Sequence, residues 1–226
     1  MRLAKQHIDV GAFTNQTEAM LAFWQNEAGL PFEELLPIGG GVRQHRHAMN
    51  GSVFKLNDAR DPLPDEGPSG YSELLIATPG HESELPLTDP DGNRVRLVTP
   101  GWNGVEGIGV RLRVRDAAAH RRFYREALEL KEFDDNSFRC GDSLLFVTED
   151  AAVGEVGKLQ ARGYRYITMQ VWDVDEAYAA IVAQGGNGAR EPFNIGTTAR
   201  IAWVRDPDGN WIEISQRASL TGPLPA

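Results

Sequence analysis

The sequence predicts an α+β protein built from repeated β-α-β-β-β units. The pentapeptide Asp-Pro-Asp-Gly-Asn occurs twice, at residues 89–93 and 206–210, and each copy leads into a strand-like run. Proline fixes φ at the start of a turn and glycine accepts positive φ, so each copy predicts a tight turn before a strand. A turn and strand that recur in each half indicate a duplication, with an N-terminal domain at residues 1–100 and a C-terminal domain at 101–220.

The first half begins with a strand and an amphipathic helix. Residues 7–13 alternate like a half-buried strand, and Asn15 with Glu18 three residues later has the pattern of a capping box. Apolar positions then follow a helical period up to Ala28, and Gly29 stands where a positive φ commonly ends a helix. Residues 80–92 show no helical period, so we expect this half to lack a second helix. The further strands expected here are 33–38, 42–49, 52–57, 71–78 and 94–99.

The second half repeats the plan with both helices. Asp116 is the expected N-cap of a helix that runs to about Leu128. Asp173 with Glu176 forms a second capping box, and the helix that it starts ends before Gly185. The strands expected in this half are 108–115, 131–133, 137–140, 144–148, 166–171, 190–195, 200–205 and 211–215.

Composition and net charge argue against several classes of binding partner. The chain has 226 residues and a net charge of −9, with 41% hydrophobic and 24% charged residues, as expected of a soluble globular protein. An acidic chain is a poor ligand for nucleic acid or for an anionic membrane. The single cysteine, Cys140, rules out an internal disulfide, and no 18-residue apolar run or secretory signal occurs. We therefore expect a cytoplasmic protein whose partner is a small molecule.

Several of these segments resemble a known superfamily. Residues 110–116, Phe123-Tyr124 and 128–130 are similar to the opening strand and first helix of vicinal oxygen chelate (VOC) proteins, and residues 171–175 and 206–214 are similar to their fifth and eighth strands. This superfamily includes glyoxalase I, the bleomycin-resistance proteins and the extradiol dioxygenases. The resemblance implies tandem VOC domains in which each pair of units curls into a U-shaped, eight-stranded cavity, the first domain being reduced. It also implies a divalent metal that chelates two neighbouring substrate oxygens.

By this resemblance, metal ligands come from the head of the first strand, the head of the fifth strand and the third residue after the Asp-Pro-Asp-Gly-Asn turn. In the first half these positions hold His7, a residue near Glu73, and Arg96. Arginine does not bind a cation, so a site for Fe, Mn, Zn or Ni needs His7 and Glu73 with an added imidazole such as His47. The alternative is that no metal binds and that the histidines are polar strand residues.

In the second half the same three positions hold Gly109, Tyr166 and Glu213, of which only Glu213 is a usual metal ligand. Strand alternation gives this cavity a different character, because it directs arginine, aromatic and amide side chains inward. An arginine fork binds carboxylates, and aromatic faces hold flat groups. The substrate-binding residues expected on this basis are Arg111, Arg113, Gln170, Trp172 and Trp211, with Arg96 in the first cavity.

Three functions remain open at this level. The chain is expected to be a glyoxalase/bleomycin-resistance/dioxygenase-like protein that acts on or binds a small oxygenated, aromatic or anionic molecule. It is a metal-dependent dioxygenase, lyase or isomerase, a metal-free binding protein of the drug-sequestering kind, or a cofactorless enzyme. The candidate catalytic residues are Glu213, His7 and Tyr166, with a base role for Glu213 or His7. An ion pair of Glu213 with Arg111 or Arg113 is the structural alternative. The resemblance allows a homodimer.

Overall fold

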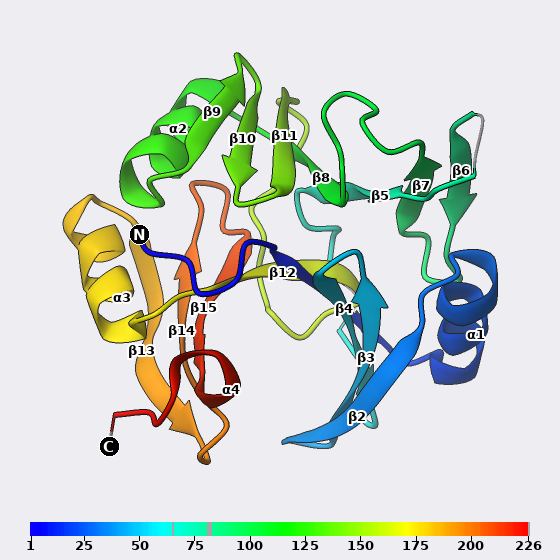
Figure 1. The fold of residues 1–226 in the computed structure, drawn as a ribbon, viewed down its shortest axis with the longest axis horizontal. Coiled ribbons are helices and arrows are strands. Elements are labelled where there is room, and N and C mark those ends of the chain that lie inside the picture. The colour runs from blue at the N-terminus through cyan, green and yellow to red at the C-terminus, as the bar shows by residue number, and fades with distance from the viewer. Residues whose placement is uncertain (65, 81–82, 226) are drawn as a thin grey trace.

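The computed structural model describes residues 1–64, 66–80 and 83–225, and its strands form two curled sheets (Figure 1). The eight-stranded sheet has the order β13 (Asn187–Ile195), β14 (Ala199–Arg205), β15 (Trp211–Arg217), β12 (Gly163–Gln170), β1 (Asp9–Thr14), β4 (Ser52–Ala59), β3 (Val42–Met49), β2 (Phe32–Gly39). The seven-stranded sheet has the order β6 (Leu85–Thr88), β7 (Arg94–Val98), β5 (Tyr71–Ala77), β8 (Ile108–Val114), β11 (Ser143–Glu149), β10 (Ser137–Cys140), β9 (Lys131–Asp134). The predicted α+β class is confirmed.

Short helices follow the first strand of three units. They are α1 (Thr17–Ala22), continued by the π-helical turn η1 (Phe23–Glu27), α2 (Ala117–Arg122), continued by η2 (Phe123–Ala127), and α3 (Val174–Ala183). A fourth helix, α4 (Ala218–Thr221), follows the last strand. Among the residues that the structure describes between β5 and β6, none is helical, in line with the reduced second unit. No helix in the described ranges is both long and apolar enough to cross a bilayer.

The two sheets do not correspond to the two halves of the chain. Strands β1–β4 join β12–β15 through the antiparallel pair β1–β12, whereas β5–β7 join β8–β11 through the antiparallel pair β5–β8. The expectation that each half closes its own cavity is therefore corrected: the outer units share one sheet and the inner units share the other. The first strands of the repeated units have similar patterns of alternating polar and apolar residues. Such a pattern therefore does not determine which other unit a given unit pairs with. The domain boundary near residue 100 stays a prediction.

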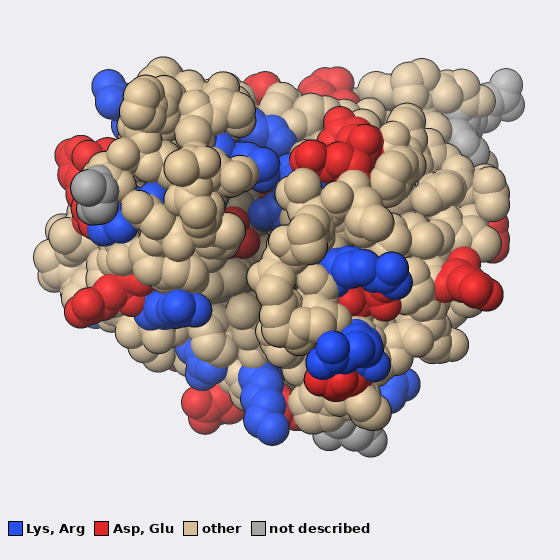
Figure 2. Space-filling view, turned by 90° about the horizontal axis from the view of Figure 1, so that it is seen from below, with Lys and Arg blue, Asp and Glu red and all other residues tan. Residues whose placement is uncertain are grey.

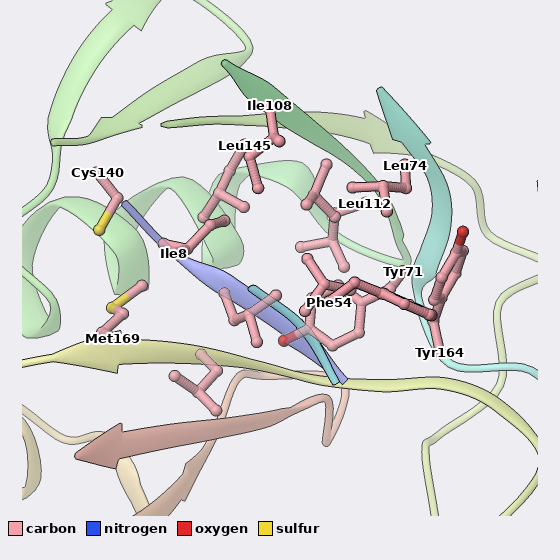
Figure 3. Close-up of a cluster of buried hydrophobic side chains, with 14 of the residues drawn as sticks. Ile8, Phe54, Tyr71, Leu74, Ile108, Leu112, Cys140, Leu145, Tyr164 and Met169 are labelled. Carbon is pink, nitrogen blue, oxygen red and sulfur yellow. The ribbon is translucent and has the colours of Figure 1, made fainter. Parts of the chain in front are cut away.

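One apolar core joins the two sheets. Figure 3 shows Ile8 and Phe54 from the eight-stranded side and Leu74, Ile108 and Leu112 from the seven-stranded side, which point into the same space. All five side chains are at most 1% exposed. Since successive side chains of a strand alternate between faces, the polar residues between these positions face the concave side of each sheet. Each sheet thus packs one face on the shared core and presents its other, concave face away from the core.

The predicted N-caps are confirmed for the helices in the second half of the chain, and the predicted N-cap in the first half is wrong. The side chains of Asp116 and Asp173 accept hydrogen bonds from backbone N–H groups three residues ahead, as predicted for N-caps. The N-cap of α1 is Gln16, which makes no capping bond with its side chain. Asn15 instead donates to the carbonyl oxygens of Ala59 and Asp61. The predicted capping box at Asn15 is replaced by a contact that holds the loop after β4.

This difference gives a test of local stability. Replacing Asp173 with Ala should lower the free energy of unfolding by about 1 kcal/mol, because the first turn of α3 loses its acceptor. Replacing Gln16 with Ala, as the matched control, should change it by less than about 0.5 kcal/mol, since no capping bond is lost. Urea denaturation followed by circular dichroism measures both. Equal losses for the two variants would contradict the assignment of the caps.

Candidate functional site

Lys55 of β4 lies at the centre of a buried polar cluster on the concave face of the eight-stranded sheet. Its Nζ atom is 2.6 Å from Thr168 Oγ1, 3.4 Å from Glu213 Oε1 and 4.0 Å from Asp9 Oδ2. Lys55 is 3% exposed and Asp9 is fully buried. Buried charges are tolerated only when they are paired, so the ammonium and the two carboxylates depend on one another. We call these four residues the Lys55 cluster.

The strand register brings the four side chains together. Asp9 of β1 pairs with Thr168 of β12, and Thr168 pairs with Glu213 of β15. Gly11 lies in register between Lys55 and Tyr166. A Cβ atom at Gly11 would lie 2.1 Å from the Tyr166 ring, so glycine at this position makes room for that side chain.

Charge coupling within the cluster is strong. Burial raises the pKa of Asp9, but the charges of Lys55 and Lys5 outweigh it, so the pKa of this carboxyl lies below its usual value. Burial lowers the pKa of Lys55, and the attraction of Glu213 and Asp9 offsets only part of that effect. The carboxylate of Asp9 therefore stays ionised, and the amine of Lys55 gives up its proton more readily than that of an exposed lysine.

Two arginines add positive charge beside the cluster. Arg46 of β3 donates through Nη1 to Gln44 Oε1 at 3.0 Å, and its Nε atom is 3.0 Å from Glu34 Oε1. Arg217 is half-buried at the end of β15, and its guanidinium makes no hydrogen bond or ion pair with any residue in the described ranges. Burial and then the nearby charge of Arg46 lower the pKa of Arg217. An arginine held in this way favours a bound anion.

The amide of Gln170 completes the polar surface. Its Nε2 atom is 3.4 Å from Asp9 Oδ2, and the side chain is 2% exposed. Its Oε1 atom is buried without a hydrogen-bond partner among the described residues. A buried acceptor of this kind lacks the bond that it normally makes, so a ligand donor at this position would be favoured.

Aromatic side chains close one end of this concave face. The Tyr166 and Trp203 rings meet edge to face with centroids 5.2 Å apart, and Trp203 meets Trp211 at 6.0 Å. Leu63 and Leu159, from the loops before β5 and β12, pack on this group. Figure 2 shows the molecule from below, where Lys, Arg, Asp and Glu atoms are visible inside a hollow between its two sides. The accessible part of the concave face is thus polar and charged.

The donor set of the Lys55 cluster does not fit a divalent metal. A metal held by Asp9 and Glu213 would need oxygen distances near 2.0–2.2 Å from ligands that face one another. The ammonium of Lys55 already lies between these carboxylates and repels a second cation. In addition, no group of three or more His, Cys, Asp or Glu side chains converges within the residues that the structure describes.

The structure separates the three residues expected to bind a metal. His7 lies just before β1, with Nε2 3.8 Å from Asp142 Oδ2, outside the Lys55 cluster. His47 is fully buried on the core side of β3, with Nε2 3.3 Å from Gln25 Nε2, and burial lowers its pKa to about 4. Glu73 belongs to the other sheet and pairs with arginines. The proposed ligand set is corrected, because each member faces a different part of the fold.

The predicted substrate-binding residues are divided between the two sheets. Arg111, Arg113 and Arg96 lie on the seven-stranded sheet, so the expected pairing of Arg111 or Arg113 with Glu213 is wrong. Tyr166 and Gln170 lie beside the Lys55 cluster. Trp211 donates to the carbonyl of Gly157 at the closed end. Trp172 follows β12, is 40% exposed and stacks with Arg2, away from the concave face.

Sequence reasoning missed Lys55. The residue stands in the run Ser-Val-Phe-Lys-Leu-Asn, where the apolar residues alternate with it, and a lysine inside a buried strand needs a partner. That pattern could have identified it. Strand parity assigns Asp9 to the cavity side together with His7, Arg94 and Arg96, but the cations beside Asp9 in the structure are Lys5 and Lys55.

Comparison with known proteins finds a family match in the second half of the chain and a similar fold over nearly all of it. The family model described as Glyoxalase/Bleomycin resistance protein/Dioxygenase superfamily matches residues 108–214. Curated proteins named lactoylglutathione lyase from Neisseria meningitidis serogroups A and B are each 47% identical over 58 residues, which is 25% of this chain. The matched segment spans 41% of each Neisseria protein, which is less than half of its length.

Solved structures agree over nearly the whole chain. The crystal structure of glyoxalase I from Zea mays superimposes with a TM-score of 0.74 and covers 95% of this chain and 92% of that one. The sequence identity is 16%, so this similarity establishes the fold alone.

Proposed function

We propose that the concave face of the eight-stranded sheet is a metal-independent site for a small 2-hydroxy carboxylate, in a chain whose residues 108–214 match the model of the Glyoxalase/Bleomycin resistance protein/Dioxygenase superfamily. The observation that carries the proposal is the buried ammonium of Lys55 between Asp9, Glu213 and Thr168. The resemblance to VOC proteins implies a divalent ion that is chelated by two neighbouring oxygens of the substrate. Here the chain's own cation takes that place.

Donor geometry supports the choice of ligand. An ammonium has three N–H donors, and those of Lys55 have Thr168 and Glu213 within hydrogen-bonding distance, while Asp9 is 4.0 Å away. The third N–H remains for a ligand oxygen. Arg217 provides a guanidinium for the carboxylate, and Gln170 Oε1 provides an acceptor for the neighbouring hydroxyl. A 2-hydroxy acid presents these two groups on adjacent carbons.

The chemistry that these residues favour is proton transfer. Glu213 is 9% exposed and beside the ammonium, so it can take a proton from the carbon that carries the hydroxyl and return it to that same carbon. Lys55 stabilises the negative charge that develops on oxygen during that step. The Tyr166 hydroxyl accepts hydrogen bonds from Asn57 and Gln44, and burial raises its pKa, so Tyr166 holds the wall of the site and stays protonated.

Lactoylglutathione lyase activity is the second candidate. The Neisseria relatives that carry this name align with 25% of this chain, and a lactoyl group is itself a 2-hydroxy acyl group. This activity would need room for a tripeptide beside the Lys55 cluster. Glyoxalase-type turnover of methylglyoxal with glutathione, assayed before and after removal of metal by a chelator, distinguishes this candidate from binding alone.

Binding of lactate tests the proposal directly. Isothermal titration calorimetry should show that lactate binds about tenfold more tightly than propionate, because propionate lacks the hydroxyl that pairs with Gln170. Arg217→Met should weaken lactate binding by roughly tenfold, since it removes the guanidinium that holds the carboxylate. The matched control is Arg122→Met, which alters an exposed arginine of α2.

The metal requirement is tested on the same protein. After dialysis against chelator, refilling with Fe(II), Mn(II), Zn(II) or Ni(II) should leave the lactate affinity unchanged and should leave no stoichiometric metal by elemental analysis. Stoichiometric metal that is lost in Glu213→Ala would refute the assignment of Lys55 as the cation. Equal affinity for lactate and propionate would refute the ligand class.

A further inference from the structure

A second polar cluster lies on the concave face of the seven-stranded sheet, around Glu73 of β5. Glu73 is 3% exposed, and its Oε1 atom accepts from Nε and Nη2 of Arg96 at 3.1 and 3.0 Å. Arg111 Nη1 is 3.0 Å from Oε2, and Arg94 Nη2 is 3.7 Å from Oε1. Glu84 pairs with Arg96 at 2.8 Å. Among the residues that the structure describes, three guanidiniums therefore share two carboxylates, and positive charge is in excess.

Arg111 carries the spare hydrogen-bonding capacity of this cluster. Its side chain is 37% exposed, and its guanidinium lies 5.7 Å from the Trp102 ring centroid. A guanidinium has five N–H donors in a planar fork, and only one nitrogen of Arg111, Nη1, lies near Glu73, 3.0 Å from its Oε2 atom. No side chain in the described ranges pairs with the outer edge of this fork, which suits a planar acceptor such as a carboxylate.

A cavity of about 720 Å³ opens beside Arg111. Phe146 of β11 is in register with Arg111 of β8, so both side chains lie on the same face of the sheet. The cavity thus combines one guanidinium with one flat apolar wall. The remaining lining residues come from α2, β11 and the turn between β9 and β10: Ala117, Asp134, Asp135, Asn136, Val147, Thr148 and Glu149.

The rim of this cavity is acidic. Glu149 Oε2 accepts from the backbone N–H of Ala117, and Asp134 Oδ1 accepts from that of Asn136, so both carboxylates are held by the fold. Asp135 adds a third negative charge. A ligand with one negative charge reaches Arg111 past this rim, whereas a second negative charge on the ligand would meet the carboxylates and be repelled.

We propose that this cavity is a second binding site, for a small monocarboxylate with a flat apolar body. The ligand carboxylate pairs with the outer edge of Arg111, and the apolar body rests on Phe146. The site lies on a different sheet from the Lys55 cluster, so it does not depend on the function proposed for that cluster.

Benzoate is the probe for this site, and phthalate, its dicarboxylate analogue, is the comparison. Titration followed by saturation-transfer NMR and calorimetry should show benzoate binding and at least roughly tenfold weaker phthalate binding. Arg111→Met should weaken benzoate binding by roughly tenfold, because the carboxylate loses its partner. The variant should fold, since Glu73 keeps Arg96; far-UV circular dichroism checks this.

Arg113→Met is the matched control, because Arg113 lies two residues along the same strand and face and pairs with Asp150. It should leave benzoate affinity within twofold of the unchanged protein. Arg217→Met, which alters the other concave face, should also leave it unchanged. The proposal is overturned by absence of benzoate binding, by equal loss in Arg111→Met and Arg113→Met, or by loss in Arg217→Met alone, which would assign benzoate to the Lys55 cluster.

Discussion

Replacing Lys55 with Met should lower the free energy of unfolding by about 3–5 kcal/mol, because it leaves the buried carboxylates of Asp9 and Glu213 facing each other without their shared cation. Methionine has a similar length and fits an apolar surrounding, so loss of charge rather than loss of volume dominates. Chemical denaturation at neutral pH measures the loss. The matched control is Lys158→Met, in which the altered side chain is 70% exposed and the expected change is below about 0.5 kcal/mol.

The pH dependence distinguishes a charge effect from a packing effect. In Lys55→Met the two carboxylates repel each other, so acidification that protonates one of them should restore part of the lost stability relative to the unchanged protein. A pH-independent loss would contradict the electrostatic account. A further variant, Lys55→His, places an imidazole between two carboxylates and should gain a thermal shift with Zn(II) or Ni(II) that the unchanged protein does not show.

The second large effect is expected at His120. This side chain is fully buried in α2, with Nε2 3.4 Å from Asp206 Oδ2 and 3.6 Å from Asp208 Oδ2. Both carboxylates belong to the second Asp-Pro-Asp-Gly-Asn turn. His120→Gln should therefore cost about 3 kcal/mol of unfolding free energy at pH 6, because a buried charge loses its counter-charge. His7→Gln, a partly exposed histidine 3.8 Å from a carboxylate, serves as control.

The cost of His120→Gln should depend on pH in a defined direction. Burial lowers the pKa of His120, but Asp206, the Asp116 carbonyl and Asp208 together raise it by more, so the folded pKa lies above the usual 6.5. A raised pKa means that the stabilisation is complete below pH 6.5 and is lost as the pH rises through the folded pKa. The difference between the two proteins should shrink between pH 6 and pH 9. A difference that grows with pH would refute the charged state of His120.

Local structure could be predicted from this sequence because its causes are local. The turns at Asp89 and Asp206, the caps at Asp116 and Asp173, and the strand alternation all depend on residues a few positions apart. Pairing of β1 with β12 depends on contacts between distant units, and no short-range pattern distinguishes this partner from β8. The capping box at Asn15 failed for a related reason, since a long-range contact with Ala59 competes for the side chain.

The candidate site was found only in part for the same reason. Glu213, Tyr166 and Gln170 were identified from the strand parity of the last unit, and they lie on the concave face as expected. Their partners, Lys55 and Asp9, come from the first unit, so their role follows only from the exchange of units between sheets. Arg111 and Arg96 both pair with Glu73 on the seven-stranded sheet, and their role in substrate binding stays a prediction.

The exchange of units also bears on how the chain acquires its structure. During synthesis β1–β4 leave the ribosome first and β1 can pair with β4, but its other neighbour is β12, which ends at Gln170, so that edge of β1 stays unpaired while most of the chain is made. The inner units can complete their sheet earlier, because β5 pairs with β8 close by in sequence. Such long-range pairing slows folding and leaves an exposed strand edge that invites aggregation. We therefore expect the nascent chain, more than the finished protein, to need a chaperone.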